Sequence, residues 1–177
     1  QVGLLRWLAR RYPDLRLPII TGVSAGAINA VFLAAHPGPL AAAVDELSRL
    51  WSELTVEKVF RVDARSLGRN VASWGLRLIS GGRVLGPPLR GLVDTAPLRR
   101  TLATSLGLNG SEEVTGIARN LREGRLAGLA VITSSYTTGQ TVAWVEGREL
   151  KDWDRPFRCS RQTRVTLDHV MASAALP

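Results

Sequence analysis

The 177-residue sequence is poor in cysteine, histidine and lysine, and each shortage excludes a class of site or protein. Its one cysteine, Cys159, cannot form an internal disulfide bond. Its two histidines, His36 and His169, do not combine with that cysteine at any metal-ligand spacing. We therefore expect no zinc site, no other metal and no cofactor. Lys58 and Lys151 are the only lysines, so arginine supplies almost all of the positive charge.

Long hydrophobic runs are missing too. No apolar stretch approaches the roughly 18–20 residues that cross a membrane. The hydrophobic content of 45% nevertheless suffices for a core, and we expect a single domain over residues 1–177 with a cytoplasmic location. The net charge is +8, but the arginines are scattered and no DNA- or RNA-binding motif accompanies them. This distribution argues against a nucleic-acid partner and leaves attraction to an anionic membrane surface open.

Hydrophobic periodicity predicts an alternation of helices and strands. Helices are expected over residues 1–11, 25–35, 40–54, 63–80 and 95–107, then from a cap at Ser111 to about residue 123, and over 167–175 after a cap at Thr166. Strands are expected over residues 17–21, 126–134 and 141–145, the last two joined as a hairpin through Thr137-Thr138-Gly139. Residues 81–91 are predicted as a glycine- and proline-rich loop, and residues 148–164 as irregular.

The run Gly22-Val23-Ser24-Ala25-Gly26 has the G-x-S-x-G pattern of a nucleophile elbow. An elbow needs a strand, a strained turn and a helix, and the predicted strand 17–21 and helix 25–35 provide this order. Gly22 and Gly26 would remove side chains that collide where helix and strand approach. The amide of Ala25 is the expected oxyanion-hole donor. The alternative is that Ser24 only caps the helix, since serine is a preferred cap.

A serine nucleophile also needs a base, and the two histidines are poor candidates. His36 lies at the far end of the helix that Ser24 starts, roughly 18 Å away at the helical rise per residue. His169 follows Asp168 directly, and adjacent helical positions point about 100° apart. A Ser-His-Asp triad is thus poorly supported, although an esterase that depends on His169 stays a hypothesis.

Several ordered motifs together resemble the bacterial patatin-like phospholipases. They are the nucleophile segment over residues 17–30, the Thr-x-Pro-Leu helix start over residues 92–99, the hairpin over residues 129–145, and Ala172-Ser173-Ala174-Ala175-Leu176-Pro177. The resemblance covers most of the chain. It implies a three-layer α/β sandwich, with a central mainly parallel sheet flanked by helices and the elbow between a strand and a buried helix.

The same resemblance implies a Ser-Asp dyad that hydrolyses acyl esters through an acyl-enzyme. Its aspartate would follow the Ala172–Pro177 segment, and its glycine-rich oxyanion loop would precede Gln1, so we expect a domain that is incomplete at both ends. We do not assign the dyad aspartate to Asp94, Asp154 or Asp168. The alternative of a different class is a catalytically incomplete lipid-binding or interaction module with the same fold.

The implied substrate is a lipid or another acyl ester. Residues 63–90 combine Trp74, Leu78 and Leu85 with Arg77, Arg83 and Arg90, which suits the headgroup region of an anionic membrane. The alternative is a helix packed on the sheet with a solvated basic face. Nothing in the sequence indicates an oligomeric state.

Overall fold

The structure is a computed structural model that describes residues 1–59, 95–108, 110–148 and 150–175. It divides into two compact units, one of residues 1–53 and 102–175, the other of residues 54–101 and 176–177. The first unit contains the whole sheet. The second includes α4 (Val56–Val59) and the beginning of α6 (Ala96–Ser105). The predicted helix 63–80 and loop 81–91 lie outside the described residues, and the single-domain organisation stays a prediction.

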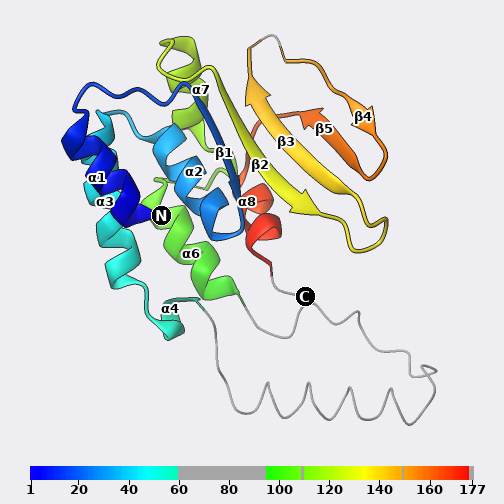
Figure 1. Ribbon diagram of the computed structural model, residues 1–177. Coiled ribbons are helices and arrows are strands. Elements are labelled where there is room, and N and C mark those ends of the chain that lie inside the picture. The colour runs from blue at the N-terminus through cyan, green and yellow to red at the C-terminus, as the bar shows by residue number, and fades with distance from the viewer. Residues whose placement is uncertain (60–94, 109, 149, 176–177) are drawn as a thin grey trace. The chain divides into compact units, whose positions relative to one another are not determined.

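A mixed five-stranded sheet forms the centre of the first unit (Figure 1). Its strands are β1 (Ile19–Val23), β2 (Gly128–Ser134), β3 (Thr141–Gly147), β4 (Asp154–Arg155) and β5 (Arg158–Gln162), in the spatial order β1-β2-β3-β5-β4. β1 pairs with β2 and β3 pairs with β5 in parallel, whereas β2–β3 and β4–β5 are antiparallel. The predicted hairpin is therefore confirmed as β2–β3.

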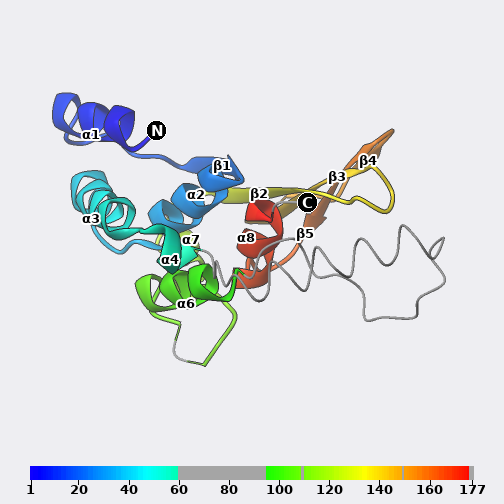
Figure 2. The same ribbon diagram turned by 90° about the horizontal axis from the view of Figure 1, so that it is seen from below.

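Helices of the first unit lie against this sheet and against one another. They are α1 (Val2–Arg11), α2 (Ala25–Ala35), α3 (Leu40–Glu53), α7 (Thr115–Arg122) and α8 (Leu167–Ala174). α2 packs on β1 and β2, and α8 packs on β2; Figure 2 shows both helices on the same side of the sheet. The predicted α/β class, with helices flanking a central sheet, is confirmed.

Small side chains allow α2 to lie deep in the core. Ala27, Ala30, Val31 and Ala34 are each no more than 2% exposed, as expected for a helix with apolar residues on most sides. α7 approaches the C-terminal end of α2 so closely that only glycine fits at position 116. A Cβ there would lie 2.4 Å from the carbonyl oxygen of Ala35. α2 is thus held between the sheet, α3, α7 and α8.

Several local predictions differ from the structure. β1 and β2 each begin two residues later than predicted, and β1 extends through Gly22 and Val23, while β3 extends to Gly147. Ser111 does not cap a helix; its hydroxyl accepts a hydrogen bond from the Glu113 amide, and α7 begins only at Thr115.

The physical reason for the late start of α7 is long-range pairing. Val114 N–H donates to the Val165 carbonyl, and Leu167 N–H donates to the Glu112 carbonyl. These bonds hold residues 112–114 extended, so a helix cannot form there. The pairing of residues 112–114 with residues 165–167 thus prevents the helix that a cap at Ser111 would start.

Residues 148–164, predicted as irregular, contain β4 and β5. The sequence is polar because these strands form the outer edge of the sheet, where few side chains are covered. In β5 only Cys159 and Ser160 are buried. An edge strand such as β4, with charged side chains, has no alternation of apolar residues. The hydrophobic pattern of residues 148–164 therefore did not predict these strands.

Candidate active site

The backbone of Ser24 is strained at the junction of β1 and α2. Ser24 has φ 55° and ψ −128°, and it shares a positive φ only with Phe157 among the non-glycine residues that the structure describes. Such a conformation costs on the order of 1–3 kcal/mol and persists where the surroundings enforce it. It turns the chain sharply between Val23, the last residue of β1, and Ala25, the first of α2. This is the strand–turn–helix arrangement of a nucleophile elbow.

The hydroxyl of Ser24 does not cap α2. Ser24 occupies the N-cap position, and its carbonyl accepts the Ala27 amide at 2.9 Å, but its side chain makes no capping hydrogen bond. The residue is exposed. The alternative of a simple helix cap is therefore wrong.

The two glycines of the motif have different roles. A Cβ at Gly22 would lie 2.2 Å from the Gly26 carbonyl oxygen and 2.7 Å from the Ala27 Cα. Gly22 thus allows the α2 backbone to rest directly on β1. A Cβ at Gly26 would meet nothing closer than the Gln1 side chain at 3.6 Å. The expected collision at Gly26 is wrong, because that position faces α1 across an ordinary van der Waals gap.

The start of α2 offers amides to an anion at Ser24. Ala25 is the first helical residue, and the first amides of a helix have no acceptor within the helix. The same end of the helix carries the positive end of the macrodipole. Ala25 N–H follows Ser24 directly at this end of the helix, and its role as an oxyanion-hole donor stays a prediction.

Ser173 of α8 joins this turn to the end of β2. Its Oγ accepts a hydrogen bond from Ser24 N–H at 2.9 Å and donates one to the Ile132 carbonyl at 2.6 Å. Ile132 is the register partner of Val23 in the β1–β2 pair. The sequence placed Ser173 in a family-like segment but did not indicate this contact, because 149 positions separate the two serines.

A second polar contact fixes the first turns of α2. Asn29 is buried; its amide donates to Gln1 Oε1 at 2.7 Å, and its carbonyl oxygen accepts from Trp51 Nε1 at 2.6 Å. The three side chains link α2 to α1 and α3. A buried amide with both groups satisfied favours one packing arrangement. Asn29 belongs to the family-like segment over residues 17–30, but the sequence did not indicate its contacts with Gln1 and Trp51.

The two histidines are engaged in contacts of their own. His36 follows the last residue of α2, at the opposite end of the helix as predicted. Its Nδ1 accepts from Gly38 N–H at 3.0 Å, and its Nε2 lies 3.5 Å from Glu46 Oε2.

His169 is held in a capping box at the start of α8. Its Nδ1 accepts the Thr166 amide at 3.1 Å, and its ring lies 4.7 Å from the ring of Trp144. Burial lowers the pKa of His169, while the Asp168 carboxylate opposes this shift. The Nδ1 lone pair of His169 is thus already occupied, and the hypothesis of an esterase that depends on His169 stays a prediction.

Two of the three aspartates considered in the sequence analysis lie in described residues. Asp154 belongs to the outermost strand, β4, and pairs with Arg161 at 2.8 Å. Asp168 is in the first turn of α8, the helix whose Ser173 contacts Ser24. Asp94 lies outside the described residues. The dyad aspartate therefore stays unassigned.

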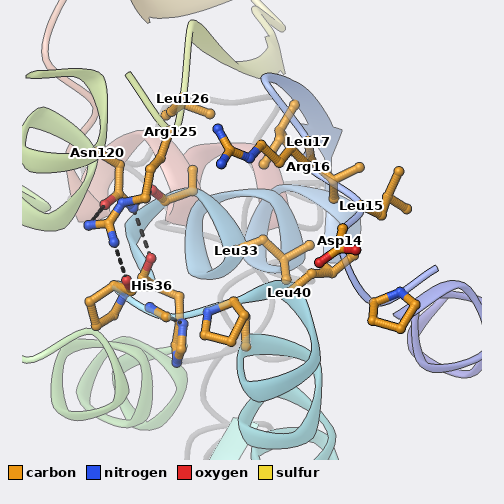
Figure 3. A pocket seen from close by; sticks show the side chains of 17 residues that line it. Asp14, Leu15, Arg16, Leu17, Leu33, His36, Leu40, Asn120, Arg125 and Leu126 are labelled. Atoms are coloured by element: carbon orange, nitrogen blue, oxygen red, sulfur yellow. Dashed lines mark hydrogen bonds between the residues drawn. The ribbon is translucent and has the colours of Figure 1, made fainter. Parts of the chain in front are cut away.

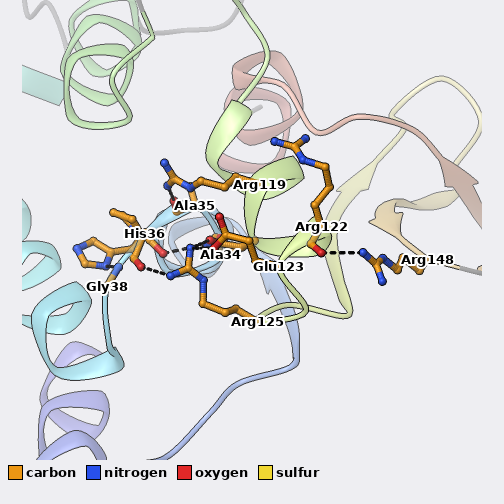
Figure 4. A network of polar contacts seen from close by, with 11 residues as sticks. Ala34, Ala35, His36, Gly38, Arg119, Arg122, Glu123, Arg125 and Arg148 are labelled. Atoms are coloured by element: carbon orange, nitrogen blue, oxygen red, sulfur yellow. Dashed lines mark hydrogen bonds and ion pairs between the residues drawn. The ribbon is translucent and has the colours of Figure 1, made fainter.

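The C-terminal end of α2 is fastened by side chains of α7 and the following turn (Figure 4). Asn120 donates to the carbonyls of Ala34 at 2.7 Å and His36 at 2.9 Å. Arg119 donates to the Ala35 carbonyl, and Arg125 to the carbonyl of Pro37. Carbonyl groups at the end of a helix have no amide donor within the helix, so these side chains supply the missing hydrogen bonds. The guanidinium groups of Arg119 and Arg125 also complement the negative end of the helix dipole. α2 is thus held at both ends.

A cavity of about 410 Å³ lies beside this C-terminal end (Figure 3). Its walls come from the segment before β1, the end of α2 and the start of α3, and they include Leu17, Leu33 and Leu40. Ser24 is not among its lining residues. Because α2 has 11 residues, the cavity is roughly 16 Å from the elbow. It is not a binding pocket for an ester that reacts at Ser24.

Comparison with known proteins gives one match. A family model described as patatin-like phospholipase matches residues 1–177. No curated protein and no solved structure matches the chain. None of the helices in the described ranges is long and apolar enough to span a membrane.

Proposed function

Because the chain belongs to the patatin-like phospholipase family, we propose that it is a serine acyl-ester hydrolase with Ser24 as its nucleophile. The family supports a lipid hydrolase in general terms. The observation that carries the specific assignment is the strained backbone of Ser24. This exposed residue stands at the N-terminus of α2, and its side chain makes no capping hydrogen bond. Strain at such a position is characteristic of functional sites.

The proposed reaction proceeds through an acyl-enzyme. Ser24 Oγ attacks the ester carbonyl carbon, and its proton passes to an aspartate base. The oxyanion of the tetrahedral intermediate accepts hydrogen bonds from Ala25 N–H and from a glycine-rich loop. The carbon–oxygen bond to the alcohol then breaks as the proton moves to the departing oxygen. Water repeats the sequence on the acyl-enzyme and releases the acid.

The base and the loop are implied by the family resemblance and belong outside residues 1–177 in this proposal. The bonding of the described histidines and of Asp154 supports this choice, since each has another partner. We accordingly expect the 177-residue chain alone to turn over esters slowly or not at all. Rapid turnover by this chain would require a base among its own residues and would contradict the dyad.

The substrate we propose is a lipid acyl ester, reached by peripheral contact with an anionic membrane from the cytoplasmic side. The +8 charge supports the membrane contact. Co-sedimentation with anionic vesicles tests it: the Arg77→Glu/Arg83→Glu variant should lose binding. Absence of binding by the parent protein would remove this part of the proposal.

The nucleophile is tested in the full-length protein with a fluorophosphonate probe and a p-nitrophenyl ester. Ser24→Ala should abolish labelling and lower turnover about 10³-fold or more. Ser48→Ala is the matched control, since the Ser48 hydroxyl only donates to the Val44 carbonyl within α3; it should retain parental activity. Unchanged turnover in Ser24→Ala would refute the assignment. A folded parent that never labels would favour the lipid-binding module.

A further inference from the structure

We propose that Ser173 is a positioning residue for the nucleophile, an inference that rests on the proposed function of Ser24. It contacts no substrate atom in this proposal. It acts by fixing the peptide group between Val23 and Ser24, and so the direction in which the Ser24 hydroxyl and the Ala25 amide point.

The Ser173 hydroxyl uses its hydrogen and one lone pair in this bridge. A hydroxyl has one hydrogen to donate, and that hydrogen goes to the Ile132 carbonyl at 2.6 Å. One lone pair accepts Ser24 N–H at 2.9 Å. The short donated bond orients the oxygen, so the lone pair is already aimed at the amide before any substrate arrives. Ser173 is therefore unsuited to be a second nucleophile.

The position of the bridge explains its importance. Val23, the last residue of β1, is paired with Ile132 of the parallel strand β2, and the chain leaves the sheet at the next residue, Ser24. Beyond this point the ladder no longer orients the backbone. The Ser173 hydroxyl replaces the missing ladder partner of Ser24 N–H, at the residue whose φ of 55° requires enforcement by its surroundings.

The remaining contacts of the elbow do not provide this restraint. Gly22 sets the distance between β1 and α2, and Asn29 fastens the helix one turn further on. Both act on α2 as a rigid body. Among the described residues, the hydrogen bond of the Ser24 amide is the one to Ser173.

Kinetics of full-length variants separate positioning from simple stabilisation. Ser173→Ala should lower kcat for a p-nitrophenyl ester, and the second-order rate of fluorophosphonate labelling, about tenfold or more, with KM changed less than threefold. Ser173→Thr keeps the hydroxyl and should recover most of the rate. Ser48→Ala removes a hydroxyl of comparable burial that bonds only within α3, and it should leave both rates unchanged. Labelling of folded Ser173→Ala at the parental rate would overturn the proposal.

Hydrogen exchange supplies a readout that does not depend on activity. The Ser24 amide should be protected in the parent and in Ser173→Thr, and it should exchange at least tenfold faster in Ser173→Ala, while amides in the middle of α2 stay protected. If the parent fails to label at Ser24, the proposed function fails, but the exchange still tests the bridge. Equal protection of the Ser24 amide in the parent and Ser173→Ala would show that Ser173 does not hold it.

Discussion

Exchanging each glycine of the elbow for alanine should change stability in opposite directions. In Gly22→Ala the new Cβ would lie 2.2 Å from the Gly26 carbonyl oxygen, an approach that real Cβ atoms essentially never show. The obstacle is backbone on both sides, so α2 must lift from β1 by about 1 Å to reach ordinary contact. Overpacking of this kind costs about 1–3 kcal/mol. We expect the upper end, because no side chain can rotate away.

Gly26→Ala should instead stabilise the protein. Its Cβ would stand 3.6 Å from Gln1 Oε1, an ordinary contact. Gly26 lies in α2 and is not among the glycines with positive φ. Alanine in a helix is favoured over glycine by roughly 0.5–1 kcal/mol. Gly3→Ala in α1 is the matched control, since no atom lies within 4 Å of its Cβ, and it should give a similar gain.

Urea denaturation followed by tryptophan fluorescence measures these free energies of unfolding. For a chain of this size about 3 kcal/mol corresponds to roughly 6–12 °C in Tm, well outside experimental error. Gly22→Ala should also lose fluorophosphonate labelling at temperatures where it stays folded, because lifting α2 displaces the Ala25 amide. A Gly22→Ala variant as stable as the parent, or a Gly26→Ala variant that unfolds, would refute the steric reasoning.

Three further predictions concern the supports of the site. Asn120→Asp keeps the shape of the side chain but cannot donate to the two carbonyls at the end of α2, and it should lower the free energy of unfolding by about 2–4 kcal/mol; an unchanged urea midpoint would contradict this. Gly116→Ala places a Cβ 2.4 Å from the Ala35 carbonyl oxygen and should cost about 1–3 kcal/mol, measured in the same way. The third uses pH: burial holds the pKa of His169 below its value near 6.5 in the unfolded chain. The unfolded chain therefore takes up the proton first, and this contribution to stability is complete above about pH 6.5 and is lost as the pH falls towards the folded pKa. His169→Gln, which can still fill the capping box, should show a smaller loss of Tm between pH 7 and pH 5; parallel Tm curves for the two proteins would disprove it.

The part of the site that the sequence predicted is the part encoded locally. Gly22, Ser24 and the apolar helix that follows are neighbours in the chain, and the sharp turn at Ser24 joins them directly. The helix boundaries at Val2–Arg11 and Leu40–Glu53 were likewise predicted almost to the residue, because amphipathic periodicity and a proline or turn signal coincide there.

The features that were missed depend on distant partners. The Ser173 bridge, the Asn29 contacts and the three side chains at the end of α2 all join residues far apart in sequence. The false cap at Ser111 has the same origin, because pairing with residues 165–167 prevents a helix. β5 was overlooked for a different reason, namely that only Cys159 and Ser160 of its five residues are buried, so the strand has no apolar alternation. The sequence did not identify the catalytic base either, and the dyad aspartate stays unassigned.

The direct contact of the Gly22 backbone with α2 also determines which positions of this protein can tolerate substitution. The height of Ser24 above the sheet is set at Gly22 by main-chain atoms, which are the same in every sequence, and not by the volume of core side chains. Substitutions of core side chains that do not contact the elbow can therefore accumulate without changing that height. An engineer could reshape the surroundings of Ser24 for a different acyl group while the elbow serves as a fixed reference point. The same contact means that position 22 tolerates almost no residue other than glycine.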